Sequence, residues 1–247
     1  MRIAAIGDVH LAWDDDDVQL IDAAGYDLVL FVGDLAGFGA AGAVRVARSI
    51  AKLRTPALVL PGNHDATTPL QLGSEVLFAS KLVNGALAAG MSRRVARLRS
   101  ALGPVPLCGY SLHRVAGVCV LAARPHTNGG PRLSFRRYLK QAFGVASMQE
   151  STARLCELFD GIAPEEPVVV LAHSGPHGLG ETRESIYAND FPERGDGGDP
   201  DLTAALAHAA RTHKAVRAVV AGHRHHRLRR GGERSWLLER DGVQYVN

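Results

Sequence analysis

The stretch at residues 28–34, Leu-Val-Leu-Phe-Val-Gly-Asp, is a continuous apolar run that ends in a glycine and an aspartate. A short apolar run of this kind is typical of a strand that is buried on both faces, as in a parallel sheet. Similar runs occur at residues 2–8 and at residues 57–65, where the apolar residues lead into Pro-Gly-Asn-His-Asp. The intervening segments 17–24 and 41–53 are predicted to be helices. This strand–helix–strand–helix–strand order predicts neighbouring parallel strands.

The rest of the chain continues the alternation and closes with a hairpin. Further strands are predicted at 115–123, 167–172 and 216–221, and further helices at 134–142, 147–159 and 201–212. Residues 235–239 and 243–246 flank Asp241-Gly242, a turn dipeptide, and predict a final antiparallel pair. No repeat or linker divides the sequence. A chain of 247 residues therefore suits one domain over 1–247, with a basic insertion at about 75–150.

Composition narrows the class of protein. Hydrophobic residues make up 46% and charged residues 21% of the chain, as in an ordinary protein with a buried core. Three cysteines without a CxxC spacing exclude a disulfide framework. No uncharged apolar run approaches the ~20 residues that a membrane-spanning helix needs, and the N-terminus resembles a strand rather than a signal peptide. We therefore expect a cytoplasmic protein with no membrane partner. The last predicted strand runs to Asn247, so either the sheet ends there or the natural chain is longer.

The net charge of +3 is unevenly distributed along the chain. Residues 76–149 contain no acidic residue but many lysines and arginines, whereas acidic residues collect at 14–17 and 181–201. Either the basic segment attracts an anionic substrate, or the basic and acidic surfaces offset each other. The arginines at 224–230 are interpreted as a solvated basic segment, because no aromatic residues are interleaved with them to stack on bases.

Polar side chains that can bind metal ions follow the predicted strands at their carboxyl ends. They are Asp8, His10, Asp34, Asn63, His64, His173, His223 and His225. In an open α/β sheet these ends meet at one crevice, so we expect the side chains to converge. Carboxylate, imidazole and amide groups suit divalent transition metals such as Mn, Fe, Zn or Co. A single histidine at a strand end is more often packed or solvated than a ligand, but that interpretation does not account for the whole set.

The motifs that contain these residues resemble those of the calcineurin-like metallophosphoesterase superfamily. They are Gly7-Asp8-Val9-His10, Gly33-Asp34, Gly62-Asn63-His64-Asp65, His173 and Gly222-His223-Arg224-His225. The resemblance implies an α/β fold, a four-layer α/β/β/α sandwich of two mixed sheets. It also implies two divalent metal ions, of Mn, Fe or Zn. One ion would be bound by Asp8, His10, Asp34 and His225, and the other by Asp34, Asn63, His173 and His223, so that Asp34 bridges them.

By the same resemblance, a metal-bound hydroxide would attack the phosphorus of a phosphoester. His64, next to the ligand Asn63, would protonate the leaving alkoxide or contact a phosphoryl oxygen. Many phosphatases of the superfamily orient this histidine with a second aspartate, three residues after the bridging one, but here that position is Gly37. Either another group such as Asp65 orients His64, or the protein relies less on acid catalysis. The Arg-Gly that follows the second aspartate in protein serine/threonine phosphatases is also missing, which weakens that analogy.

The segment between Asp65 and His173 resembles a branch of the superfamily whose substrate the sequence does not name. The resemblance rests on Ala123-Arg124-Pro125, Gly129-Gly130-Pro131 and the residues around His173. Arg124 follows a predicted strand and could bind substrate phosphate, or it could form a surface salt bridge. Trp13 either lines the substrate site or packs in the hydrophobic core. The acidic residues at 14–17 are interpreted as the start of a helix rather than as metal ligands.

The expected function is that of a metal-dependent phosphatase or phosphodiesterase. The basic segment favours an anionic substrate, a phosphomonoester, nucleotide or phosphodiester, over a choline-like ester; it is compatible with nucleic acid without specifying it. The alternative from another class is a non-catalytic metal-binding scaffold for protein interaction, although such proteins usually lose ligands. A mononuclear hydrolase of another bond is disfavoured by the bridging Asp34. The sequence does not indicate the oligomeric state.

Overall fold

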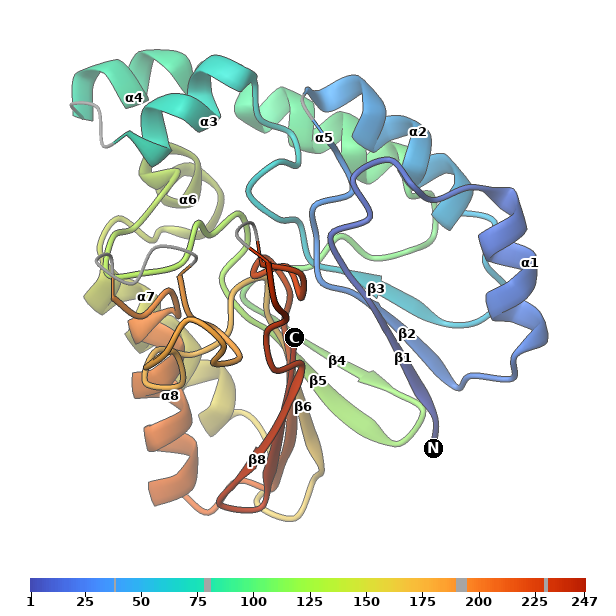
Figure 1. Ribbon diagram of the computed structural model, residues 1–247, viewed down its shortest axis with the longest axis vertical. Coiled ribbons are helices and arrows are strands. Elements are labelled where there is room, and N and C mark those ends of the chain that lie inside the picture. The colour runs from blue at the N-terminus through green and yellow to red at the C-terminus, as the bar shows by residue number, and fades with distance from the viewer. Residues whose placement is uncertain (38, 78–80, 190–194, 229–230) are drawn as a thin grey trace.

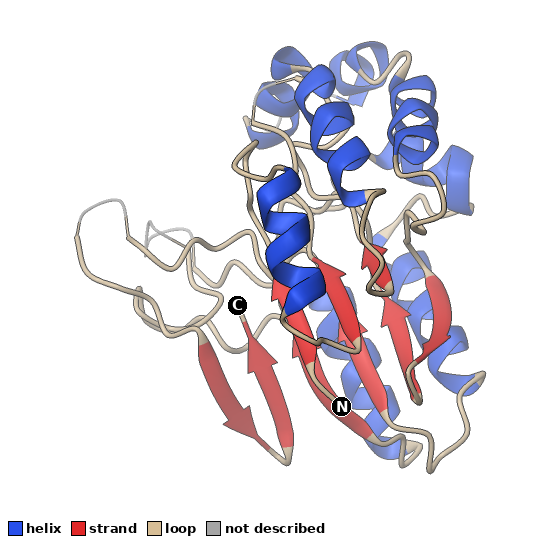
Figure 2. Cartoon of the chain, turned by 90° about the vertical axis from the view of Figure 1, so that its right-hand side faces the viewer, coloured by secondary structure: helices blue, strands red, loops and turns tan. Residues whose placement is uncertain are grey.

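The computed structural model describes residues 1–37, 39–77, 81–189, 195–228 and 231–247, without the side chains of residues 81 and 82. Two β-sheets pack face to face, and helices cover their outer faces (Figures 1 and 2). The smaller sheet consists, in spatial order, of β1 (Ile3–Ile6), β2 (Leu28–Phe31) and β3 (Ala57–Val59). The order in the larger sheet is β4 (Ser111–Val115), β5 (Val118–Ala122), β6 (Val168–Leu171), β7 (Val216–Val220), β9 (Val243–Val246) and β8 (Leu237–Arg240).

Two groups of helices form the outer layers, and two further helices lie at one end of the molecule (Figure 1). Next to the smaller sheet lie α1 (Asp15–Ala23), α2 (Ala40–Ile50) and α5 (Met91–Ala101). Next to the larger sheet lie α6 (Arg136–Phe143), α7 (Met148–Asp160) and α8 (Pro200–Arg211). The two at the end are α3 (Pro69–Val76) and α4 (Lys81–Leu87).

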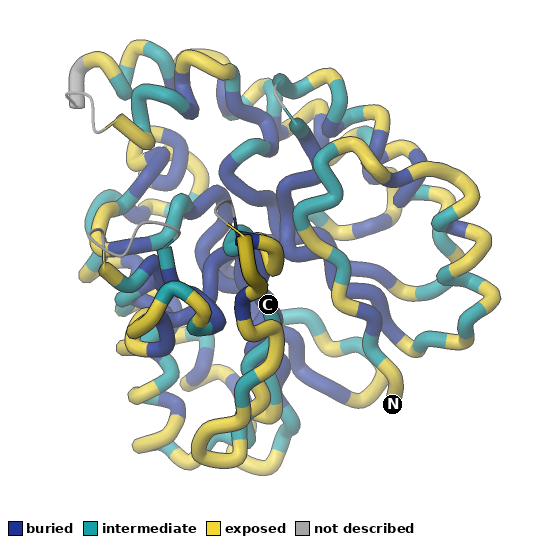
Figure 3. The backbone as a smooth tube through the Cα atoms, viewed as in Figure 1, coloured by how far each residue is buried: buried dark blue, intermediate teal, exposed yellow. Residues whose placement is uncertain are grey.

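The alternation of side chains along the strands produces three stacked apolar layers. In β2, Leu28 and Leu30 pack between the sheets, whereas Val29 and Phe31 pack under the helices. Strand β5 divides its side chains in the same way between the sheet–sheet core and the α6–α8 side. Successive strand side chains point to opposite faces, so a continuous apolar strand is needed wherever both faces are covered. Figure 3 shows this buried interior running through the middle of the molecule.

These observations confirm the four-layer fold and refine one expectation. Among the described strands, those of the smaller sheet pair only in parallel, so this sheet is not mixed. The larger sheet is mixed, because its outer pairs β4–β5 and β8–β9 are antiparallel and its inner pairs are parallel. The predicted closing hairpin is confirmed as β8 and β9. The basic segment 76–149 supplies β4 and β5 of the larger sheet as well as outer helices.

The start of α1 explains two further sequence features. Asp14 caps the helix with its side chain, and the Asp17 side chain accepts a hydrogen bond from the Asp14 backbone, forming a capping box. The helix-start interpretation of the acidic run is therefore confirmed. Trp13 is 4% exposed, and its ring lies 5.1 Å from that of Phe31, which confirms core packing for this residue. No helix in the described part of the chain is long and apolar enough to cross a membrane.

Candidate metal centre

The predicted ligands lie on loops that follow strands of both sheets. Asp8, Asp34 and Asn63 follow β1, β2 and β3 of the smaller sheet. In the larger sheet, His173 follows β6, and His223 and His225 follow β7. Parallel strands present their carboxyl ends at the same edge, which brings these loops together.

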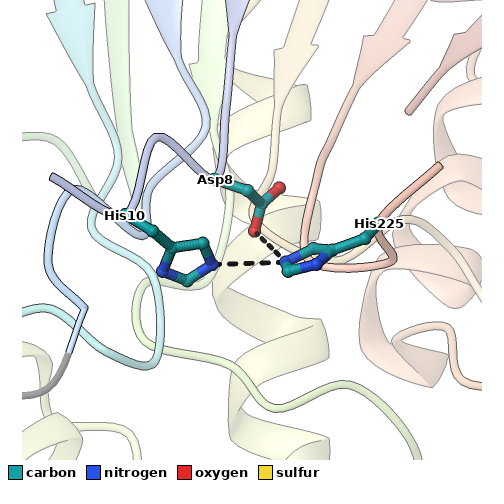
Figure 4. Close-up of side chains that lie close together, drawn as sticks. All are labelled: Asp8, His10 and His225. Carbon is teal, nitrogen blue, oxygen red and sulfur yellow. Dashed lines mark hydrogen bonds and ion pairs between the residues drawn. The ribbon is translucent and has the colours of Figure 1, made fainter. Parts of the chain in front are cut away.

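One group of possible ligands consists of Asp8, His10 and His225 (Figure 4). The ligand atoms of this group all lie within 4.8 Å of one another. The Nε2 atoms of His10 and His225 are 3.2 Å apart, and Nε2 of His225 is 3.6 Å from Oδ1 of Asp8. Three possible ligand atoms, from two imidazoles and a carboxylate, therefore lie close enough together to bind one ion.

The second group consists of Asp34, His173 and His223, again with ligand atoms within 4.8 Å of one another. Nε2 of His173 lies 3.6 Å from Oδ1 of Asp34 and 2.9 Å from Oδ1 of Asn63. Asp34, Asn63 and His173 are buried, whereas the first group is more open to solvent. The structure thus places the amide oxygen of Asn63 next to the second group.

Backbone carbonyl groups fix the orientation of three of these imidazoles. Nδ1 of His10 donates to the carbonyl of Ala36 (2.9 Å), and Nδ1 of His173 donates to the carbonyl of Val32 (2.7 Å). In His223 it is Nε2 that donates, to the carbonyl of Asn128 (3.0 Å). A carbonyl only accepts hydrogen bonds, so each of these nitrogens carries the hydrogen. In the neutral ring the other nitrogen then holds a lone pair, which is the arrangement found in metal-ligating histidines.

The motif glycines make room for the ligands. A Cβ atom at Gly62 would lie 2.2 Å from Oδ1 of Asp34, and one at Gly222 would lie 2.5 Å from Oδ2 of Asp8. Both distances are far shorter than any van der Waals contact. Glycine at these two positions therefore lets the neighbouring loops approach the carboxylates closely.

Several ligands occupy strained backbone conformations. The φ angles of Asp8, His10, Asp34 and His223 are 51°, 41°, 53° and 68°, in the left-handed region that costs a non-glycine residue ~1 kcal/mol or more. Backbone hydrogen bonds between the loops maintain this geometry. The N–H of Asp8 donates to the carbonyl of Gly33, and the N–H of His10 donates to the backbone carbonyl of Asp34. Strain of this kind persists where the surrounding structure over-determines the backbone, as it does here.

The electrostatics of the site fit a bound cation. Oδ1 of Asp8 is buried and accepts no hydrogen bond of ordinary length among the described residues, with Nε2 of His225 3.6 Å away, so a cation beside it would offset the cost of its burial. Burial alone would lower the pKa of His173, but the nearby carboxylates of Asp34 and Asp8 outweigh burial and raise it. The carboxylates therefore favour positive charge at His173, whereas burial and the charge of Arg224 lower the pKa of His223. The carboxylate and imidazole donors of the site are those that intermediate divalent metals prefer.

His64 lies beside the first group, and its ring centroid is 5.1 Å from that of His10. Nδ1 of His64 donates to the carbonyl of Gly37 (2.6 Å), and its backbone N–H donates to Oδ1 of Asp34 (2.9 Å). The carbonyl at position 37 thus contacts the ring, at the position where many related phosphatases have an aspartate side chain.

Asp65 was the other expected partner of His64, and the structure gives it a different role. Its two carboxylate oxygens accept hydrogen bonds from the backbone N–H groups of Ala36 (3.0 Å) and Gly62 (2.9 Å). Burial, followed by the charge of Asp34, raises the pKa of Asp65 to about 7. Asp65 therefore ties the loop after β2 to the loop after β3, whereas the described ring contact of His64 is with the carbonyl of Gly37.

Arg124 is not brought into the site. Its side chain is 1% exposed, and its guanidinium donates to Asp199 (2.6 Å) and to Asp201 (2.9 and 3.1 Å). A guanidinium that is buried between two carboxylates cannot reach a substrate phosphate without breaking both ion pairs. The expectation of substrate contact is corrected accordingly. The alternative of a salt bridge describes Arg124 better, although the pairs are buried rather than at the surface.

Sequence reasoning missed the carbonyl groups that orient the ligands, those of Val32, Ala36 and Asn128. Every residue carries the same backbone carbonyl group, so no sequence pattern marks these positions. The buried Asp199 was also missed as a partner of Arg124. Its position before Pro200 at the start of α8 is a helix-start signal that could have drawn attention to it.

The fold and the paired carboxylate–imidazole groups define a metal-dependent hydrolase of the two-sheet α/β class. A family model described as calcineurin-like phosphoesterase matches residues 1–227, and the chain belongs to this family. The family hydrolyses phosphoesters with a dinuclear metal centre, and the two ligand groups agree with that property.

Solved structures share the fold at low sequence identity. The protein TT1561 of Thermus thermophilus is 14% identical, with a TM-score of 0.56 over 99% of this chain and 87% of that chain. Phosphopantetheinyl hydrolase (PptH) from Mycobacterium tuberculosis is 15% identical, with a TM-score of 0.53 over 100% and 88% of the two chains. A dimetal phosphatase from Danio rerio is 12% identical, with a TM-score of 0.53 over 99% and 85%. No match is found among curated proteins.

Proposed function

We propose that this protein hydrolyses a phosphoester of an anionic small molecule or nucleotide at a dinuclear metal centre. The observation that carries the proposal is the pair of ligand groups, Asp8–His10–His225 and Asp34–His173–His223, next to each other at the strand ends. Asp34 would bridge the two ions, and Asn63 would complete the second. Two divalent cations bound by these residues would polarise the phosphoryl group and lower the pKa of a coordinated water.

His64 is proposed as the acid for the leaving group. Donation from Nδ1 to the carbonyl of Gly37 makes Nε2 the nitrogen that exchanges a proton with the substrate. The ring lies beside His10 at the edge of the first group, close to where a substrate oxygen would depart. Protonation of an alkoxide by a positioned imidazole typically accelerates such a step by about 10²–10⁴-fold.

The charge distribution supports an anionic substrate. Exposed basic side chains on α5 and α6 include Arg93, Arg97, Arg136, Arg137 and Lys140, and the sequence from 76 to 149 contains no acid. The acidic run at 14–17 is engaged locally, in the α1 capping box and in the pair between Asp15 and Lys52. Phosphomonoesters, nucleotides and phosphodiesters fit this charge, as would a phosphopantetheinyl ester, the type of substrate that the name of the Mycobacterium tuberculosis neighbour indicates.

The experiment measures metal content and hydrolysis of p-nitrophenyl phosphate and bis-p-nitrophenyl phosphate after reconstitution with Mn²⁺. We expect two ions per wild-type chain, and loss of both activity and tight metal binding in Asp34→Asn. We expect His64→Gln to keep both ions but lose about 10²–10⁴-fold in kcat. His208→Gln, a change on α8 at a histidine paired with Asp160, serves as the matched histidine control. Stoichiometric metal without turnover of either ester would favour the non-catalytic scaffold instead.

A further inference from the structure

The orientation of the His223 ring depends on the carbonyl of Asn128, which belongs to the loop at residues 127–130. Nε2 of His223 donates to this carbonyl at 3.0 Å. If the carbonyl moved away, Nε2 would lose this acceptor, and the ring could adopt the other tautomer or rotate. The geometry of the second ligand group therefore depends on what holds this loop.

Thr127 holds the loop from within. Its hydroxyl donates to Oδ1 of Asp199 (2.8 Å) and accepts from the backbone N–H of Gly129 (2.8 Å). The side chain of Thr127 is buried, with 1% of the residue exposed. The Gly129 N–H belongs to the same peptide unit as the Asn128 carbonyl, so the second bond helps to set where this carbonyl points, together with the bonds of Asn128 to Ser134 and Arg224.

The partner of Thr127 is itself fixed. Oδ1 of Asp199 also accepts from the buried guanidinium of Arg124 at 2.6 Å. The backbone N–H of Gly130 donates to the carbonyl of Gly198 (3.0 Å), which joins the 127–130 loop to the segment before α8. The loop is thus anchored to a buried ion pair rather than to solvent.

Close packing leaves the loop little freedom. A Cβ atom at Gly129 would lie 2.1 Å from the carbonyl oxygen of Gly197 and 2.9 Å from Oγ of Ser174. Ser174 directly follows the ligand His173. The same loop therefore packs against the residue next to one ligand and hydrogen-bonds to another.

We propose that Thr127 is a positioning residue of the metal centre, whose hydroxyl places the Asn128 carbonyl so that His223 keeps its Nε2–H tautomer and presents Nδ1 to the second ion. The proposal rests on the proposed function in one respect, that Asp34, His173 and His223 hold an ion. Loss of an outer hydrogen-bond partner of a ligating histidine typically costs about 10–100-fold in metal affinity.

The test compares Thr127→Val, which removes the hydroxyl at nearly constant shape, with Thr127→Ser, which keeps it. The tautomer of His223 is read from ¹⁵N imidazole chemical shifts of the metal-free protein, and ion affinities from calorimetric titration with Mn²⁺. We expect Thr127→Val to show mixed tautomers and to bind one of two ions about 10–100-fold more weakly. We expect Thr127→Ser to stay close to wild type in both measurements.

Thr212→Val is the matched control, because the Thr212 hydroxyl donates to the carbonyl of His208 at the end of α8, away from the ligand loops. It should leave tautomer and affinity unchanged. The proposal is overturned if Thr127→Val retains a pure Nε2–H tautomer and wild-type affinity for both ions. Should Thr127→Val not fold, the metal-free wild type still decides, since an Nδ1–H tautomer of His223 there would refute the proposal. Neither readout needs turnover, so an inactive but metal-binding protein would refute the proposed function alone.

Discussion

Arg124 is among the largest fully buried side chains of the protein, and its charge is balanced by Asp199 and Asp201. Replacement by Met would leave these two carboxylates without their cation. Breaking a buried ion pair on one side costs about 3–5 kcal/mol, because the remaining charge stays buried. We expect Arg124→Met to lower the free energy of unfolding by that amount in urea denaturation.

Arg114→Met is the matched control for this variant. Arg114 pairs with Glu166 at 2.7 Å, but its side chain is 58% exposed, so its loss should change the free energy of unfolding far less than the loss of Arg124. The assignment would be contradicted if both variants lost equally little free energy of unfolding and Arg124→Met raised the KM. Such a result would indicate that Arg124 contacts the substrate.

At the residue scale, the side chains of the candidate metal ligands were more predictable from the sequence than the backbone groups that orient them. Asp8, His10, Asp34 and the histidines after β6 and β7 stand in motifs whose spacing can be read directly from the sequence. The role of Asp65 could not be predicted, because it depends on two backbone N–H groups that the fold brings to its carboxylate. The expectation for Arg124 was wrong because the sequence does not show that the start of α8 places two acids against it.

At the scale of single elements, Asp22 connects α1 to the segment that precedes β3. Its carboxylate, 5% exposed, accepts hydrogen bonds from the backbone N–H and hydroxyl of Thr55 and from the backbone and side chain of Arg54. Burial alone would raise the pKa of Asp22, but these hydrogen bonds outweigh burial and lower it to about 2.

The lowered pKa gives the stability of the protein a defined pH dependence. Since the folded-state pKa lies below the ordinary value of 3.8, ionised Asp22 stabilises the fold above pH 4, and this stabilisation is lost as the pH falls from about 4 to 2. We expect Asp22→Asn to lower the free energy of unfolding by ~1–3 kcal/mol at pH 7 and to reduce its decline between pH 4 and 2.

Urea unfolding at several pH values measures this effect. Asp27→Asn is a suitable control, because Asp27 accepts a backbone hydrogen bond from Arg2 at an exposed position. An Asp22→Asn variant whose stability fell with acid as steeply as that of wild type would contradict the assignment. Ester hydrolysis should be unchanged, since Asp22 lies on the helix side of the smaller sheet.

Elements with strong periodicity were predicted, including β5 and α6 in the basic segment, whereas the elements in the first part of that segment were missed. The first three strands and their connecting helices were expected from continuous apolar runs, although α2 ends at Ile50 rather than at residue 53. No element was expected between residues 66 and 114, where α3, α4, α5 and β4 lie. Thr68 and Pro69, an N-cap followed by a proline in the first turn, are a start signal for α3 that was available in the sequence.

For the whole molecule, apolar strands predicted burial on both faces but not what covers each face. In β2 the even-numbered residues meet the other sheet and the odd-numbered ones meet helices, a difference that leucine, valine and phenylalanine do not encode. The resemblance to a known family supplied the second sheet. The purely parallel pairing of the smaller sheet among the described strands follows from its short helical crossovers, which were visible in the sequence.

Each ligand group takes residues from both sheets, so metal ions should stabilise the whole molecule. Asp8 and His10 follow β1 while His225 follows β7, and Asp34 follows β2 while His173 and His223 follow strands of the larger sheet. At about 100 times its Kd, one ion adds about 2.7 kcal/mol to the free energy of unfolding, because it binds only the folded state. For a chain of this size that corresponds to a rise in Tm of roughly 5–10 °C per ion.

The Tm of chelator-treated protein should therefore rise when Mn²⁺ is added. The shift should be strongly reduced in Asp34→Asn and retained in Asp22→Asn, whose change lies outside both groups. A Tm that is independent of Mn²⁺ at concentrations where calorimetry detects two bound ions would show that the ions do not bind the folded state selectively.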